Sequence, residues 1–201
     1  DIQVKAQAEI TRGQLITARA VEARLMAERD KKSEIDFPPF LLTALDDPRA
    51  TSSVSLQKQL FLSRRSVLKH EIEALDESIT GMNLQVSGLE QARKSKEEQR
   101  LFLKEQLTNM RELAQEGYVP RNRVLELERL DAQLNSDLST DIGNIGRLRR
   151  QISEFNLKRL QRLEEYQREV HQQLTDVQRE AESLNSRLLA QDFELANVFV
   201  K

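Results

Sequence analysis

The two histidines, His70 and His171, are the residues in this sequence best suited to begin a metal site. If the chain folds back on itself, they lie at a similar height on neighbouring helices, and paired imidazoles are common ligands of transition metals. A metal site also needs further ligands held in a pocket, and a two-helix ribbon offers none. We therefore interpret both histidines as solvated helix residues and expect no metal and no cofactor.

Carboxylates are abundant, with 33 Asp and Glu residues, so pairs for general acid and base catalysis can always be drawn. Such a pair works only in a water-excluding cleft that shifts its pKa values, and nothing in the sequence builds one. No glycine-rich phosphate loop and no Ser/His/Asp grouping stands out. The chain has no cysteine, which excludes thiol catalysis and Cys-based zinc sites. We expect no enzymatic activity.

The composition favours long exposed helices over a compact core. Charged residues make up 32% of the chain, aromatic residues only 4%, and the net charge is -2 with the signs interspersed. The absence of a basic patch disfavours a nucleic-acid partner. No apolar run approaches the roughly 20 residues that cross a bilayer, and no signal peptide opens the chain. We expect a piece of a longer protein whose contact with a membrane is made by segments outside it.

Proline divides the chain, because its ring and its missing N–H break helices. The four prolines, Pro38, Pro39, Pro48 and Pro120, leave two very long stretches uninterrupted. The pattern predicts a first helix at 1–34, a linker loop at 35–49, an ascending helix at 50–116, a tip turn at 117–120, a descending helix at 121–193 and the start of a strand at 194–201. The expected fold is all-α, a long antiparallel coiled-coil hairpin with an additional N-terminal helix packed near its base.

Both long helices carry a heptad stripe of apolar residues. Alternating steps of three and four lead from Phe61 to Ala114, and the descending helix continues the stripe through Leu127, Leu130 and Leu134 to Leu188. Successive spacings of four at 166–174 widen the apolar face. We therefore expect the first helix to pack against residues 163–188 as a third helix.

Three basic residues, Arg93, Lys96 and Arg100, interrupt the stripe of the ascending helix. If paired residues have numbers that add to about 237, Arg100 meets Asp137 and Lys96 meets Asp141 across the hairpin. Polar seam residues cost stability and fix the alignment of the helices. We favour this register role for the polar seam over a direct binding role.

The turn resembles the hairpin tip of HlyD-type membrane fusion proteins, the periplasmic adaptors of type I secretion. Residues 110–129 read MRELAQEGYVPRNRVLELER, and the nearest likeness is to the adaptors of protease, lipase and hemophore exporters, the PrtE, AprE, LipC and HasE group. Residues 192–201 resemble the family's passage into a split lipoyl-like domain. The resemblance implies a protein anchored in the inner membrane, with its hairpins in the periplasm. It also implies a ring of six copies that joins an ABC transporter to a TolC-like outer-membrane channel.

The resemblance also implies which residues dock to the channel. Related adaptors carry an Arg at the tip, a Leu four residues later and a Ser or Thr seven residues after that. Leu113 fills the Leu position, whereas Asn109 and Pro120 occupy the other two, so the charge would come from Arg111, Arg121 or Arg123. The residues assigned to the docking tip are Leu113, Gly117, Tyr118, Val119, Pro120, Arg121 and Arg123.

Two residue types at the apex point to different roles. Gly117 is suited to the left-handed conformation that follows a helix end, so making the turn is its simpler role. Tyr118 and Val119 have almost no core to enter at the end of a thin hairpin, which indicates a partner surface. A cytoplasmic coiled-coil arm or tether remains the alternative, since it would share the seam, the turn and the helix lengths.

Overall fold

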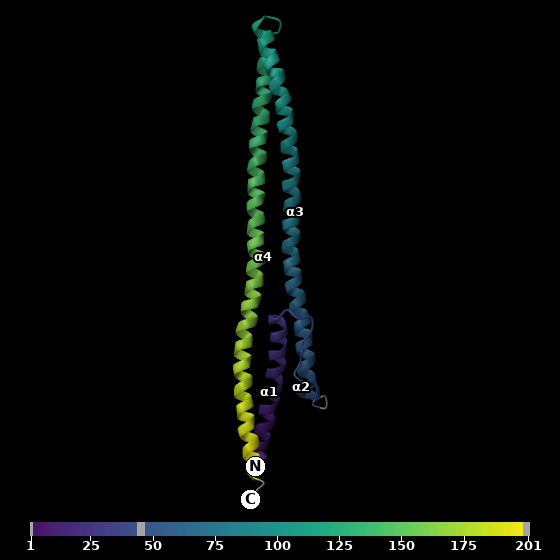
Figure 1. The fold of residues 1–201 in the computed structure, drawn as a ribbon, viewed down its shortest axis with the longest axis vertical. Coiled ribbons are helices and arrows are strands. Elements are labelled where there is room, and N and C mark those ends of the chain that lie inside the picture. The colour runs from purple at the N-terminus through teal and green to yellow at the C-terminus, as the bar shows by residue number, and fades with distance from the viewer. Residues whose placement is uncertain (1, 44–46, 199–201) are drawn as a thin grey trace. The chain divides into compact units, whose positions relative to one another are not determined.

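The chain is helical over most of its length. The computed structural model describes residues 2–43 and 47–198, which form α1 (Ile2–Arg29), α2 (Pro39–Thr43), α3 (Pro48–Gln115) and α4 (Arg121–Val198), as Figure 1 shows. No helix in these ranges has a segment long and apolar enough to cross a membrane. The expected all-α hairpin with an additional N-terminal helix is confirmed.

Two compact units make up the structure. The three-helix unit contains residues 1–71 and 161–201, and the hairpin unit contains residues 72–160. The three-helix unit therefore holds α1, α2 and one segment each of α3 and α4. The hairpin unit holds the remaining segments of α3 and α4 with the turn between them.

The first helix ends at Arg29 and not at residue 34, because the backbone closes a Schellman motif there. Lys31 has a φ of 54°, the N–H of Lys32 donates to the carbonyl of Ala27 over 2.9 Å, and the N–H of Lys31 donates to Glu28 over 3.3 Å. This left-handed position is normally glycine, since a Cβ is strained in it. The sequence has lysine there, so the helix end gave no sequence signal.

Replacing Lys31 with glycine is expected to stabilise the chain. Lys31 is exposed and carries the left-handed φ, so Lys31→Gly relieves backbone strain without opening a cavity. The net gain should be about 0.5 to 1 kcal/mol in urea unfolding, since the extra freedom of glycine in the unfolded chain offsets part of the relief. The matched control is Lys32→Gly, one residue beyond the left-handed position, which should not stabilise. An equal gain in both variants would contradict this explanation.

The expected linker at 35–49 is not a plain loop, because its prolines begin helices. Pro39 starts the short helix α2, with the N–H of Leu41 donating to the carbonyl of Pro38 over 3.0 Å. Pro48 starts α3 two residues before the expected boundary, and Asp47 Oδ1 accepts from the backbone N–H of Arg49 over 2.9 Å as an N-cap.

The far end of α4 differs from the expectation of a strand. The helix continues through Val198, so residues 194–198 are helical and not extended. They add Leu195 and Ala196 to a helix whose last turn has no proline or glycine to stop it. The rest of the expected strand, residues 199–201, lies outside the described residues.

In the three-helix unit, α1 uses two faces. One face packs on α4 in a core cluster whose buried members are Ala18, Leu25, Tyr166, Val170, Leu174, Val177, Ala181 and Leu184. The other face packs on α2 and the start of α3 through Ile16, Ala20, Ala23, Phe37, Leu41 and Ala50. The expectation that the first helix packs against 163–188 is therefore confirmed.

A buried polar network joins α1 to α3 in the same unit. Arg24 Nη1 donates to Glu28 over 2.6 Å and Arg24 Nε donates to Gln57 over 2.7 Å, and all three side chains are buried. Arg64 adds a bond from Nε to Glu28 over 3.3 Å and stacks over the ring of Tyr166. Each buried charge thus has an opposite partner, which its burial requires.

In the hairpin unit, α3 and α4 pack through the heptad seam. Near the turn the buried residues are Leu103, Leu107, Val124 and Leu127. Farther along, they are Val86, Ile145 and Leu148, with Met82, Leu89 and Ile152 half-buried beside them. This sequence of layers follows the stripe expected for the ascending helix.

Candidate docking tip and polar seam

The turn between the long helices is a second Schellman motif, here with the expected glycine. Gly117 has a φ of 81°, its N–H donates to Ala114 over 3.2 Å, and the N–H of Tyr118 donates to Leu113 over 2.9 Å. A Cβ built on Gly117 would meet nothing within 4 Å, so the backbone conformation, and not crowding, requires glycine. Pro120 directly precedes α4, and its carbonyl accepts from Arg123 N over 3.0 Å.

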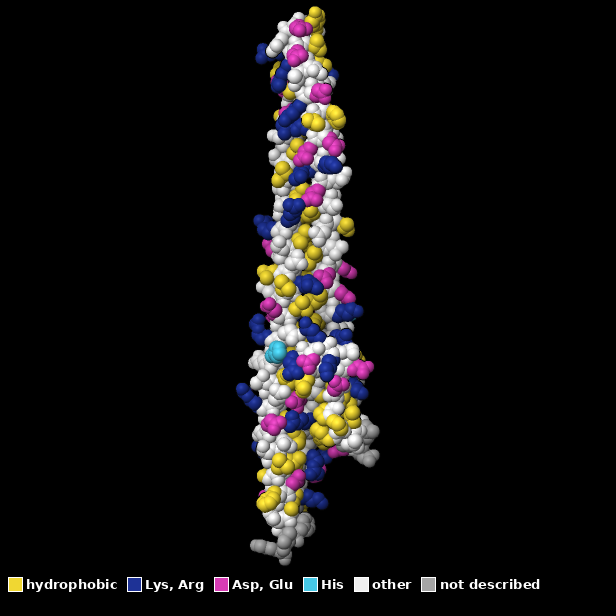
Figure 2. Space-filling model, viewed as in Figure 1, with side chains coloured by type: hydrophobic (Ala, Val, Ile, Leu, Met, Phe, Trp, Pro, Cys, Tyr) yellow, Lys and Arg dark blue, Asp and Glu magenta, His cyan; other side chains and the backbone are white. Residues whose placement is uncertain are grey.

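The tip presents apolar side chains outward. Tyr118 is 76% exposed, Leu113 and Leu125 are also exposed, and Val119 is half-buried. Figure 2 shows hydrophobic side chains gathered at the end of the hairpin unit where the chain turns. Leu125 was not among the residues predicted for the docking tip, because it lies outside the seam. An apolar residue outside the seam is the sequence signal that could have identified it.

The arginines of the tip differ in whether they form an ion pair. Arg111 Nη2 pairs with Glu128 across the turn over 2.8 Å, and Arg123 Nη1 pairs with Glu126 of its own helix over 2.8 Å. Arg121, the first residue of α4, is exposed at the apex. The structure thus brings the candidate tip residues together at one end of the hairpin unit, with Arg111 and Arg123 already engaged by carboxylates.

The polar seam forms, with one pairing different from the expectation. Lys96 Nζ pairs with Asp141 over 2.7 Å, as the register predicted, and Asp141 is buried. Arg100 does not meet Asp137: its Nε donates to Asp131 over 2.8 Å and its Nη1 to Asn135 over 2.6 Å. Asp137 instead accepts from Gln133 of its own helix over 3.0 Å.

Arg100 pairs differently because the residues of α4 that face α3 near the turn are not the ones expected. Leu130 was placed in the stripe, but it is 50% exposed, whereas Asp131 is half-buried. Steps of three and four from Val124 lead through Leu127 to Asp131, so the aspartate takes the seam position beside Arg100. Arg93, the third basic seam residue, pairs with Glu97 of its own helix over 3.3 Å.

Acid should weaken the hairpin partly through Asp131. The hydrogen bond from Arg100 lowers the pKa of the Asp131 carboxyl below its ordinary value. Its stabilising contribution is present above the unfolded pKa, about 4, and is lost as the pH falls through the lower folded value. In urea unfolding between about pH 5 and pH 2, Asp131→Asn should lose less stability than the parent chain. The control is Asp137→Asn, because the Asp137 carboxylate bonds Gln133 rather than a cation, and this variant should lose as much stability in acid as the parent chain. Equal losses in all three chains would contradict the role of Asp131.

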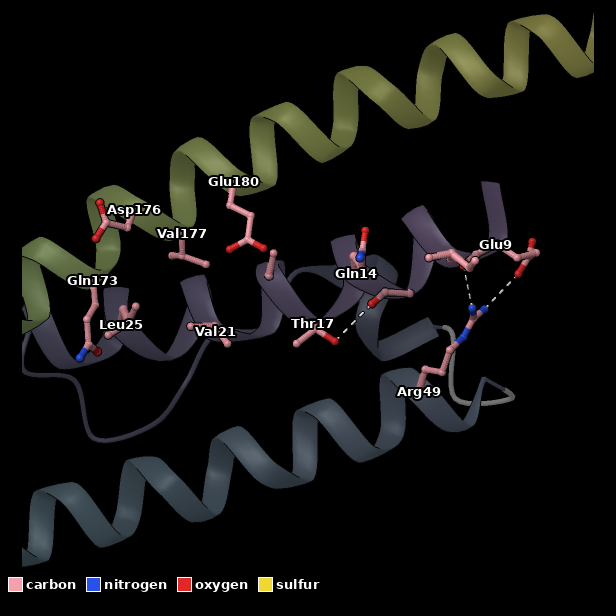
Figure 3. A pocket seen from close by; sticks show the side chains of 13 residues that line it. Glu9, Gln14, Thr17, Val21, Leu25, Arg49, Gln173, Asp176, Val177 and Glu180 are labelled. Carbon is pink, nitrogen blue, oxygen red and sulfur yellow. Dashed lines mark hydrogen bonds and ion pairs between the residues drawn. The ribbon is translucent and has the colours of Figure 1, made fainter. Parts of the chain in front are cut away.

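A groove on the three-helix unit is a second candidate site. It measures about 690 Å³ and lies between α1 and α4, with Gln173, Asp176 and Glu180 of α4 along one side (Figure 3). Arg49 reaches in from the start of α3 and binds Glu9 over 3.2 Å. The described residues contain no group of three or more His, Cys, Asp and Glu side chains that could hold a metal. This open groove has the features of a helix surface and not of a catalytic cleft.

Comparison with known proteins identifies the family. Residues 4–194 match the family model described as AprE, long alpha-helical hairpin. The chain belongs to the AprE hairpin family. The chain is 35% identical over 199 residues to the alkaline protease secretion protein AprE of Pseudomonas aeruginosa, covering 99% of this chain and 46% of that protein. It is 36% identical over 182 residues to the proteases secretion protein PrtE of Dickeya chrysanthemi, covering 90% and 41%.

A third relative and a solved structure are also similar to this chain. The type I secretion system membrane fusion protein PrsE of Rhizobium meliloti is 29% identical, with 87% of this chain and 40% of that protein covered. The crystal structure of the soluble domain of LipC, a membrane fusion protein of a type I secretion system, superposes with a TM-score of 0.95 at 41% identity. That match covers 98% of this chain and 74% of the LipC chain. The chain spans less than half the length of the AprE, PrtE and PrsE proteins, and the match falls on the AprE hairpin.

Proposed function

We propose that this chain is the hairpin of a periplasmic adaptor of type I protein secretion. The adaptor is anchored in the inner membrane and bridges an ABC transporter to a TolC-like outer-membrane channel through the hairpin tip. The names of AprE, PrtE, PrsE and LipC support this role, since each is a secretion or membrane fusion protein. A cytoplasmic tether, the alternative, has no counterpart among these names. An adaptor acts by contact, and we expect no catalysis.

The observation that carries the docking role is the exposed apolar tip held by a rigid turn. Tyr118 has most of its surface in solvent, yet the hydrogen bonds of the Schellman motif fix its backbone. An exposed aromatic residue three positions before the exposed Arg121 in the chain has the character of an interface anchor. Leu113, Val119 and Pro120 complete this surface, and Gly117 supplies its backbone geometry.

Tip substitutions should separate docking from folding. Tyr118→Ala combined with Arg121→Glu removes an aromatic anchor and reverses a charge where few intramolecular contacts are made. Export by the full-length adaptor should fall by at least tenfold, while the free energy of unfolding changes by less than about 0.5 kcal/mol.

The matched control is Leu84→Ala combined with Arg150→Glu, two exposed positions of the hairpin unit distant from the turn in sequence. This pair makes the same kinds of change and should leave export intact. Normal export by the folded tip variant would refute docking through these residues. Lost export with a lowered unfolding midpoint would assign them to the turn instead.

A further inference from the structure

A small pocket lies in the three-helix unit at the point where α1 ends. It has a volume of about 310 Å³ and lies between the end of α1 and facing turns of α3 and α4. It is more enclosed than the groove beside Arg49, and all of its lining residues belong to the three-helix unit. The residues of its apolar wall are Ala27, Phe61, Leu68, Leu163 and Tyr166.

The pocket exists because the apolar stripes of α3 and α4 continue past the end of α1. Leu68 belongs to the stripe of α3 and Leu163 to that of α4, and both are half-buried. Leu68 packs against the core cluster that α1 forms with α4. Helix α1 ends at Arg29, so the helix itself extends no farther over these side chains. A ligand in the pocket would cover apolar surface that one more turn of α1 would otherwise bury.

Exposed cations line the same pocket. They are Lys31, Lys32 and Arg65. Lys32 pairs with a nearby aspartate over 2.6 Å, whereas Arg65 Nη1 donates to a neutral group, the carbonyl of Ser33, over 3.3 Å. The lining also contains the carboxylate of Glu28, which is buried and already held by two arginines. The pocket therefore combines an apolar wall with exposed positive charge.

Two of these cations occupy positions that favour other residue types. Lys31 has a φ of 54°, a left-handed conformation in which glycine would be more stable. Backbone strain of this kind is concentrated at functional sites. Arg65 occupies a stripe position of α3 between the apolar residues Phe61 and Leu68. Positions suited to glycine and to an apolar residue thus both supply positive charge to one pocket.

We propose that this pocket binds a single-chain amphiphile with a carboxylate head, of the fatty-acid class. Lys31 and Arg65 bind the carboxylate through charge-assisted hydrogen bonds, and the apolar wall binds the chain. A cavity of about 150 Å³ holds benzene, so the volume of about 310 Å³ admits a chain of roughly eight to ten carbons. The same side chains would repel a cationic head. This ligand site goes beyond the proposed adaptor role, and neither proposal depends on the other.

Decanoate is the probe, added to the purified chain below its micelle concentration and followed by calorimetry. It should bind saturably, with a single molecule per chain, and at least tenfold more tightly than decylammonium, which has the same chain length and the opposite charge. Tyrosine fluorescence supplies a local readout, because the sequence has two tyrosines and no tryptophan. In a Tyr118→Phe background the emission of Tyr166 should change over the same range of decanoate concentration.

Variants of the cations locate the binding site. Lys31→Gly with Arg65→Gln should weaken decanoate binding about tenfold or more while the chain stays folded, because both positions are exposed. Lys31→Arg keeps the charge and should keep the affinity. The matched control is Arg179→Gln, which removes an exposed cation of the same unit roughly 18 Å along α4 from Gln167, and it should leave binding unchanged.

Each outcome decides the proposal. Saturable decanoate binding that weakens in the double variant and persists in Arg179→Gln supports it. Equal affinity for decanoate and decylammonium would overturn it, as would unchanged binding by the double variant or unchanged emission of Tyr166. Absence of decanoate binding would also overturn it, whether the pocket is then empty or covered by a second copy of the chain. None of these measurements involves export, so the docking role is tested separately.

Discussion

Glu28→Ala should lower the free energy of unfolding by about 3 to 5 kcal/mol, the largest loss expected from a single substitution of a polar residue in this chain. The Glu28 side chain is 1% exposed and accepts from both Arg24 and Arg64. Its removal leaves the guanidinium of Arg24 buried without a carboxylate, and a buried unpaired charge is far more costly than a missing contact. Urea unfolding of the purified chain measures the change.

An exposed pair with the same spacing is the control for Glu28. Lys32 and Asp36 are also four residues apart, but both are exposed, so Asp36→Ala should cost less than about 1 kcal/mol. Tyr166 supplies a second readout, because burial and then the charge of Glu28 raise its pKa above the ordinary value. With Tyr118→Phe as background, Tyr166 is the sole tyrosine, and Glu28→Ala should lower its pKa in an absorbance titration. An unchanged stability together with an unchanged titration would contradict the role of Glu28.

Asp141→Ala should destabilise the hairpin unit by about 1 to 3 kcal/mol, because it leaves the partly buried ammonium of Lys96 without a carboxylate partner in the seam. Replacing both partners, Lys96→Leu with Asp141→Leu, should restore or exceed the parent's stability, since leucine packs at seam positions without a desolvation cost. The same double variant should allow α3 and α4 to pair in more than one register. Thermal unfolding measures the first effect and backbone hydrogen exchange across residues 93–107 measures the second.

The contrast between single and double variants is what tests the register role. A double variant as unstable as Asp141→Ala would show that the charges stabilise the seam directly. A double variant that is stable and exchanges as slowly as the parent would show that the polar seam is not needed to fix the alignment. Arg123–Glu126, an exposed pair within one helix, gives the reference for a pair with little effect, and Glu126→Ala should change stability by under 1 kcal/mol.

The seam positions were predictable from sequence where the heptad spacing leaves only one candidate residue. Alternating steps of four and three from Phe61 pass through Arg65 and continue to Ala114, and the residues on these steps are buried or half-buried apart from Arg65. The descending helix was ambiguous near the turn, since both Leu130 and Asp131 continue a spacing of three or four from Leu127. The apolar residue was chosen, but the cation of Arg100 opposite makes the aspartate the better seam residue. That choice depends on a partner helix and not on the pattern of α4 itself.

Helix ends were predictable where the residue type matches the backbone requirement. Gly117 and Pro120 mark the tip turn correctly, because glycine favours a positive φ and proline favours a helix start. Lys31 takes the same left-handed conformation without any such preference, so the end of α1 was placed five residues too late. The strand expected from residue 194 failed for a related reason: nothing in the sequence stops α4 there.

The network of Arg24, Glu28 and Gln57 could not be foreseen from α1 alone. On a helical wheel, an arginine and a glutamate four residues apart read as an exposed pair. They are buried because α3 lies over them and Gln57 and Arg64 complete their bonds. Polar residues inside a small helical bundle therefore become visible only once the third helix is in place.

The position of the polar seam also bears on how the hairpin unit folds. Met110 and Leu127 pack near the turn and are close in sequence, so their contact closes a short loop and can form early. Pairing that grows from the turn then reaches Arg100 and Asp131, and next Lys96 and Asp141. A chain that began out of alignment would arrive with unpaired charges in the seam and would stall before the longer stretch beyond could close. We therefore expect the two ion pairs to favour the native alignment during folding, because a misaligned hairpin would have to bury unpaired charges after only a few turns of helix.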